Sequence, residues 1–243
     1  KFVVSNDAVI GPSGILTHTA NSTAQTHRLF LDVEGNLTIA SGGKIDVSGR
    51  GYRYASGPGA GLGTSGGGGL GSFYAGGGAG YGGNGGYSVD YAGGSAYGSL
   101  SQPTDLGSGG GNGYESYGAS GGGVVKIKIS GMFTLNGSVI SRGNNGVDST
   151  WSTGAGSGGS IWIDTNEISG SGTISANGGD AGYEGGAGGG GRTALYYASG
   201  TISSLTQTAY GGLIGRGAQS GAAGTVYKKM HSSSYGDLVV DNN

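Results

Sequence analysis

Acidic side chains are the residues of this chain best able to perform chemistry. Asp32, Asp46 and Asp164 lie in strand-like segments and are expected to face the same way on neighbouring strands. Enzymes that cleave polysaccharides need clustered carboxylates over a cleft. No local spacing pairs these acids, and no catalytic motif accompanies them. The sequence therefore predicts a protein that is not an enzyme, with a polysaccharide-active enzyme as the least favoured alternative.

Metal and nucleotide sites are equally weak in the sequence. His18, His27 and His231 share no metal-ligand spacing, and the chain has no cysteine. Gly-x-Gly clusters arise by chance in a chain with 63 glycines, and none opens a helix that would hold phosphate. Asp180 and Glu184 lie in an expected loop, where oxygen ligands suit Ca²⁺. They are a weak calcium candidate, and no other cofactor is expected.

Sugars are the remaining candidate ligands. Trp151 and Trp162 offer flat rings on which a sugar can stack, although such rings also pack irregular cores. Glycans are also a candidate modification, because three Asn-x-Ser/Thr triplets match the N-glycosylation rule. These triplets begin at Asn21, Asn36 and Asn136.

Composition limits the class of protein. The 243 residues suit one large all-β domain, and a net charge of -2 argues against a nucleic-acid partner. No apolar run approaches the roughly 18–20 residues that span a bilayer, so no membrane span is expected. The absence of cysteine fits an extracellular or cell-surface location. The first residue is Lys1 rather than methionine, which indicates a processed or internal start.

A repeat sets the expected fold. Four strand-like runs follow glycine clusters at a spacing of roughly 31–35 residues, a period typical of repeat architectures. The runs are aligned on Ile127, Trp162, Leu195 and Val226, and a turn and a second strand-like run follow each. Stacked repeats of this kind bury a continuous core. The sequence predicts an all-β, parallel β-helix (β-solenoid) of residues 1–243 with long glycine-rich loops, and a β-sandwich is the runner-up.

A long insertion interrupts the repeat at about 51–123. It holds almost half of the glycines and most of the tyrosines. Glycine-rich chains behave as flexible linkers unless something orders them. The tyrosine rings favour order, because each buried ring contributes on the order of 1.5–3 kcal/mol. We expect extended glycine runs that pack backbone against backbone, with tyrosine rings filling the gaps.

With the repeat laid out, a family resemblance becomes visible. Segments 38–52, 170–179 and 191–197 carry its motifs, among them Lys44-Ile45-Asp46-Val47-Ser48-Gly49-Arg50-Gly51-Tyr52. They resemble the glycine-rich parallel β-helix repeats of large bacterial extracellular, adhesin-like surface proteins. The resemblance implies a surface location and an adhesive or structural role, and it carries over no active-site residue.

The two ends of the chain have similar sequences. Phe2, Val3 and Val4 near the start match Leu238, Val239 and Val240 near the finish, and neither end has an obvious capping element. Uncapped strands invite further pairing, and head-to-tail stacking of identical units produces filaments. We therefore expect a structural unit whose partners are copies of itself, either as protomers of a filament or as a tandem array. An adhesin or glycan-binding module is the alternative.

Overall fold

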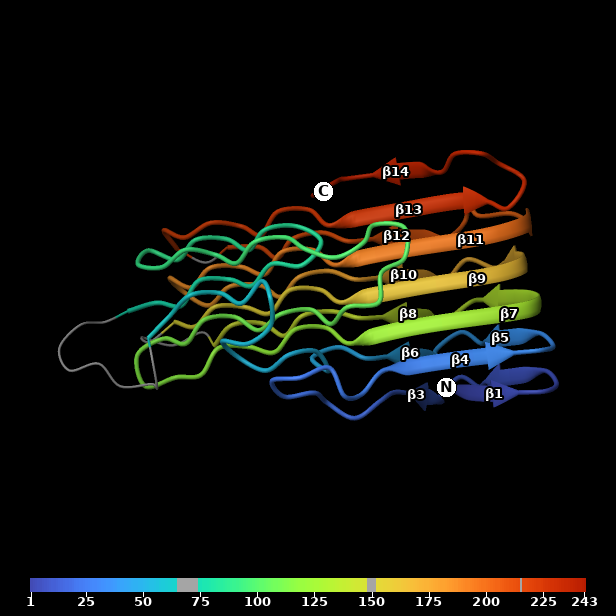
Figure 1. Ribbon diagram of the computed structural model, residues 1–243, viewed down its shortest axis with the longest axis horizontal. Coiled ribbons are helices and arrows are strands. Elements are labelled where there is room, and N and C mark those ends of the chain that lie inside the picture. The colour runs from blue at the N-terminus through green and yellow to red at the C-terminus, as the bar shows by residue number, and fades with distance from the viewer. Residues whose placement is uncertain (65–73, 148–151, 215) are drawn as a thin grey trace.

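The structure, a computed structural model, describes residues 1–64, 74–147, 152–214 and 216–243. Every regular element in these residues is a β-strand, and almost every strand pairs in parallel with the equivalent strand of the next coil. The strands form a stack with the chain's two termini at opposite ends, and glycine-rich segments extend from one side (Figure 1). The predicted parallel β-solenoid is confirmed, and the alternative β-sandwich is wrong.

Two sheets form the walls of the solenoid. The main path of the nine-stranded sheet contains β1 (Phe2–Val4), β4 (Leu29–Val33), β7 (Val124–Leu135), β9 (Ser160–Ser169), β11 (Arg192–Gly200), β13 (Thr225–Met230) and β14 (Asp237–Val239). Beside it, β2 (Ala8–Ile10) pairs with β5 (Leu37–Ile39), which pairs with the second half of β7. The five-stranded sheet contains β3 (Ile15–Leu16), β6 (Lys44–Asp46), β8 (Ser138–Ile140), β10 (Thr173–Ser175) and β12 (Thr206–Thr208).

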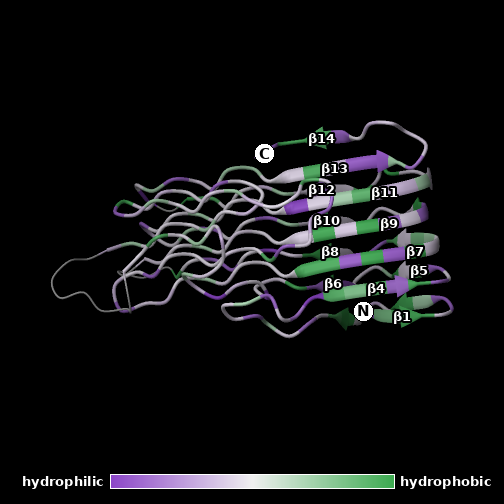
Figure 2. Ribbon diagram, in the orientation of Figure 1, coloured by the Kyte–Doolittle hydropathy of each residue, from purple (hydrophilic) through white to green (hydrophobic). Residues whose placement is uncertain are grey.

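The core consists of columns in which each coil contributes one inward side chain. One column of the larger sheet runs through Phe2, Leu31, Ile127, Ile163, Leu195 and Lys228. The facing column of the smaller sheet runs through Leu16, Ile45, Val139, Ile174 and Gln207. Alternate residues point outward, which gives the alternating hydropathy along β7 in Figure 2.

The register corrects the alignment expected from sequence. Ile127 and Leu195 do occupy one column, but its member on β9 is Ile163 rather than Trp162, and its member on β13 is Lys228 rather than Val226. A shift of one residue turns a side chain from the core to the outer face. Trp162 therefore faces outward, and Lys228 occupies an interior position.

The glycine-rich segments form a second ordered body beside the strands. Their backbone groups hydrogen-bond across large sequence separations: Gly77 N–H to Leu62 C=O (2.8 Å), Gly111 N–H to Gly77 C=O (2.8 Å) and Gly154 N–H to Gly111 C=O (3.0 Å). The described residues of the 51–123 insertion thus interleave with the shorter loops of the later coils. Backbone-to-backbone packing, expected from the sequence, is what the structure contains here.

Glycine is required in this body because a side chain would not fit. A Cβ added at Gly154 would overlap the carbonyl oxygen of Gly77, and one added at Gly111 would overlap that of Leu62. Neither glycine has a positive φ. Positive φ occurs at a few turn glycines, such as Gly42 and Gly170, so tight turns explain only a minority of the glycines.

Two tyrosines, the buried Tyr81 and the half-buried Tyr97, connect the glycine body to the strands. The rings of Tyr81 and Tyr97 lie 4.8 Å apart, and the Tyr81 hydroxyl is 2.6 Å from the Ser160 hydroxyl at the start of β9. At the start of β11, Arg192 donates two hydrogen bonds to the Tyr97 carbonyl, at 3.0 Å and 2.8 Å. Burial raises the pKa of both tyrosine hydroxyls well above the ordinary value. These contacts join segments that are far apart in sequence.

The packing of the glycine body predicts a difference between two alanine substitutions. Gly154→Ala should lower the free energy of unfolding by about 1–3 kcal/mol, because the new methyl group forces the backbone of Gly77 to move. Gly11→Ala, whose methyl group would meet open space, should change it by less than about 1 kcal/mol. Equilibrium unfolding in denaturant measures both. Equal effects would contradict the role assigned to backbone contact.

The two tyrosines that connect the glycine body to the strands predict a loss of stability in alkali. An unfolded tyrosine ionises near pH 10, whereas Tyr81 and Tyr97 stay neutral to higher pH in the folded chain. Their contribution to stability is therefore complete below about pH 10 and declines as the pH rises above it. Unfolding measured from pH 8 to 11.5 should show a smaller alkaline loss for Tyr97→Phe than for the unaltered chain. The exposed Tyr87→Phe is the control, and a slope unchanged by Tyr97→Phe would refute the assignment.

Candidate functional site

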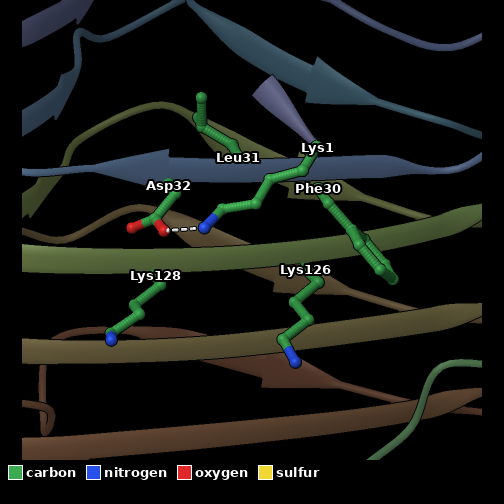
Figure 3. A pocket seen from close by; sticks show the side chains of 6 residues that line it. All are labelled: Lys1, Phe30, Leu31, Asp32, Lys126 and Lys128. Atoms are coloured by element: carbon green, nitrogen blue, oxygen red, sulfur yellow. Dashed lines mark ion pairs between the residues drawn. The ribbon is translucent and has the colours of Figure 1, made fainter. Parts of the chain in front are cut away.

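The outer face of the larger sheet carries a concentration of cationic and aromatic side chains. Lys126 and Lys128 project side by side from β7 (Figure 3). In register with them on β4 are Phe30 and Asp32, and on β9 Trp162 and Asp164. This face follows from the Val-Lys-Ile-Lys-Ile alternation of β7, in which the isoleucines enter the core and both lysines must point outward.

A shallow groove of about 240 Å³ lies between β4 and β7 on this face. Its lining residues are Lys1, Phe30, Leu31, Asp32, Lys126 and Lys128. The Lys1 ammonium lies 2.6 Å from the Asp32 carboxylate, so the groove's one acid is already neutralised (Figure 3). Within the described part of the chain, neither Lys126 nor Lys128 has a carboxylate at ion-pair distance.

Aromatic rings hold Lys126 in place. Its ammonium lies 3.5 Å from the ring centre of Trp162 and 5.8 Å from that of Phe30, both within the range of a cation–π contact. Partial burial lowers the pKa of Lys126. Trp162, a predicted sugar-stacking residue, is partly exposed on this face and meets Tyr196 edge to face at 6.4 Å. Trp151, the other, lies outside the described residues.

The acids considered for catalysis are not brought together. Asp32 and Asp164 share the outer face, but Lys128 stands between them in the register. Asp164 lies 2.9 Å from His231, and Asp46, on the other sheet, accepts a hydrogen bond from the Ser48 N–H at 3.0 Å. Each carboxylate therefore has a local partner, and no two of the three form a pair suited to acid–base chemistry.

The weak calcium candidate gains no support. The Asp180 carboxylate forms an ion pair with Arg142 and accepts a hydrogen bond from the Leu213 N–H at 3.0 Å. Glu184 is fixed through its N–H, which donates to the Ser152 hydroxyl at 2.9 Å. Among the described residues, no group of three His, Asp or Glu side chains is placed to hold a metal ion.

The three glycosylation candidates lie in different surroundings. Asn21 is buried, and its side-chain N–H donates to the carbonyls of His27 and Arg50, both at 2.8 Å. A glycan on that nitrogen would break this network, so the structure argues against Asn21 as an acceptor. Asn36 and Asn136 are exposed at turns, as predicted, although the Asn36 side-chain oxygen accepts a bond from Met132 N–H.

The N-terminal end of the solenoid is open. Among the described residues, the strands β1, β2 and β3 each pair with one neighbour and have no partner on their other edge. Phe2, the first member of an interior column, is 62% exposed, because no described coil covers it. Val9 and Ile15 are exposed at 72% and 64% on the same terminal coil.

The C-terminal end differs from the N-terminal end. β14 pairs antiparallel with β13, whereas β1 pairs parallel with β4, so the sequence similarity between the two ends does not correspond to equivalent strands. Two interior positions at this end are polar: Lys228, which lies opposite Asp237 of β14, and Gln207 of β12. Leu238, Val239 and Val240 nevertheless remain exposed. β14 thus covers part of β13 at this end, whereas β12 has no further strand partner among the described residues.

Sequence reasoning missed Lys126 and Lys128 as site residues, although the signal was present. Their strict alternation with buried isoleucines fixes their direction as soon as the strand is assigned. The polar interior positions at the C-terminal end were harder to find. Lys228 and Gln207 are recognised only after the register between coils is known.

The geometry defines a parallel β-solenoid with a packed glycine-rich body. Comparison of the chain with models of known protein families, with curated proteins and with solved structures finds no match. A search of the described residues finds no helix of the length and apolarity that crossing a membrane requires. The class of fold therefore rests on the strand pairing itself.

The different roles of the asparagines predict different costs of substitution. Asn21→Ala should lower the free energy of unfolding by about 1–3 kcal/mol, because it leaves partly buried backbone groups of the 21–27 loop without their side-chain partner. Asn136→Ala, at an exposed turn, should lower the free energy of unfolding by less than about 0.5 kcal/mol. Denaturant unfolding of both variants is the measurement. A change of less than about 0.5 kcal/mol in the free energy of unfolding for Asn21→Ala would contradict the role of this side chain in holding the loop.

Proposed function

We propose that the chain is a structural unit of an extracellular surface protein or filament, and that copies assemble head to tail through their terminal strands. The open N-terminal coil is the observation that carries this proposal. There, three strand edges have no partner among the described residues, and an apolar interior column ends at the exposed ring of Phe2. Free edges and uncovered core positions both favour the addition of another coil.

The C-terminal end supplies a suitable partner surface. Val239 lies opposite Val226 across the β13–β14 pair, so it extends an interior column of the larger sheet by one position. It is 42% exposed, and the outer edge of β14 has no strand partner in the described residues. A second copy can place β1 along this edge. In the smaller sheet, β12 and β3 are the corresponding free edges.

Such a contact joins different surfaces of the two copies. A heterologous contact of this kind does not close on itself unless its rotation forms a ring, so it leads to a linear array. The polar interior side chains of Lys228 and Gln207 limit the apolar surface that the free C-terminal end exposes to water. Recognition at that end therefore depends on the edge of β14.

The proposed location outside the cell has separate support. It rests on the likeness of the glycine-rich repeats to those of large bacterial surface proteins and on the absence of cysteine. That the chain is not an enzyme stays a prediction. The separation of Asp32 from Asp164 by Lys128 supports it.

Charges placed on the N-terminal edge should prevent assembly. Phe2→Lys combined with Leu16→Lys puts two ammonium groups on the interior columns, where the next copy would have to bury them without a partner. Sedimentation velocity and electron microscopy should show the unaltered chain elongating with concentration and the variant remaining monomeric. Circular dichroism checks that the variant is folded.

Leu62→Lys is the matched control, because this leucine is 57% exposed and lies in the glycine-rich insertion, where its backbone bonds to Gly77 and Ala92. It should assemble as the unaltered chain does. Elongation of the double variant would refute the proposal. Discrete dimers of the unaltered chain that never elongate would also refute it, since they indicate a symmetric contact between like ends.

A further inference from the structure

We propose that the outer face of the larger sheet binds an acidic polysaccharide, with carboxylate groups of successive sugars on Lys126 and Lys128 and sugar rings against Phe30 and Trp162. This inference is independent of end-to-end assembly, because the face lies on the side of the stack and not at its ends. It gives the chain a binding site and specifies the charge of the ligand.

The charges on this face favour an anionic ligand. Burial and the neighbouring Lys128 charge lower the pKa of Lys126, against the opposite effect of Asp164. Asp32, between these lysines and the N-terminal edge, is already paired with Lys1. Asp164, beyond them, is paired with His231. Among the described residues, these two neighbouring cations have no carboxylate at ion-pair distance, so a ligand carboxylate would stabilise them through charge-assisted hydrogen bonds.

The rings beside these cations favour a sugar as the carrier of that carboxylate. Phe30 and Trp162 flank Lys126 along the stacking direction of the coils. Both are partly exposed, and they present apolar surface on either side of a fixed charge. A sugar ring has apolar C–H faces and a polar rim, which matches this alternation of ring and ammonium.

The shape of the face favours a polymer over a small anion. The groove of about 240 Å³ is shallow and is bounded by β-strands rather than enclosed by loops. Aromatic rings continue along the stack beyond Trp162. The ring centres of Trp162 and Tyr196 are 6.4 Å apart, and those of Tyr196 and Tyr227 are 5.8 Å apart. Near the start of β11 the 97–101 segment covers this face, where Tyr196 donates to the Ser101 carbonyl at 2.8 Å. The open part therefore lies over β4, β7 and β9.

Nucleic acid fits this surface less well than an acidic polysaccharide. A phosphate backbone requires a broad basic surface, whereas the chain has a net charge of -2 and this face also carries Asp32 and Asp164. A polysaccharide with intermittent carboxylates needs only a few cations at intervals.

Binding to polygalacturonate tests the inference, with dextran of similar length as the neutral comparison and dextran sulfate as the sulfated one. Isothermal titration calorimetry at 50 mM salt should detect polygalacturonate binding and no dextran binding. Lys126→Gln and Lys128→Gln should each weaken the affinity at least about tenfold, because each removes a charge-assisted contact. Trp162→Ala should weaken it further in the Lys128→Gln background.

Lys44→Gln is the matched control, since it removes the same charge from β6 on the other sheet. It should leave the affinity unchanged within about twofold. Equal losses from Lys44→Gln would mean that only net charge matters and would overturn the proposal. So would dextran binding as tight as that of polygalacturonate, or tighter binding of dextran sulfate or single-stranded DNA. Absence of any polygalacturonate binding would also overturn it.

Discussion

Backbone hydrogen bonding between successive coils is the interaction on which the whole structure depends. In the strands it fixes a parallel register, so that Leu31, Ile127, Ile163 and Leu195 fall into one interior column. In the loops the same kind of bond joins segments without strand geometry, as at Gly77, Gly111 and Gly154. Close approach of backbones is possible in the loops only where no Cβ intervenes. The glycine content is thus a packing requirement.

The sequence was sufficient to predict the class of fold, and the reason is physical. Alternating apolar residues in β7 and β9, separated by glycine clusters, cannot bury their apolar face except by stacking. The sequence did not determine the register, because apolar, aromatic and polar residues all occur at neighbouring positions of these runs. The alignment of Trp162 with Ile127 was wrong by one residue. It placed the outward-facing Trp162 in a column of inward-facing aliphatic side chains. The reversal of β14 depends on the turn after Met230, which has no strong turn signature.

The candidate sites were only partly predictable, for a related reason. The exposed ring of Phe2 follows from its place on the outermost strand of the described residues, where β4 is its one neighbour. The cationic face depends instead on which residues of three separate coils fall side by side. Phe30, Lys126 and Trp162 come together only when the coils are stacked, since the long 51–123 insertion separates the first from the others. The two proposals thus concern independent surfaces, the ends of the solenoid for other copies and its side for a ligand.

Amide hydrogen exchange in the 74–123 segment tests the central claim most directly. If glycine segments pack through backbone bonds, the N–H groups of Gly77, Gly94, Gly107 and Gly111 should exchange far more slowly than in an unstructured chain, and on the same timescale as those of β7 and β9. Exchange of these glycines at the rate of a free peptide, with only the strands protected, would contradict the account. The glycine-rich body would then be a flexible insertion beside an otherwise intact solenoid.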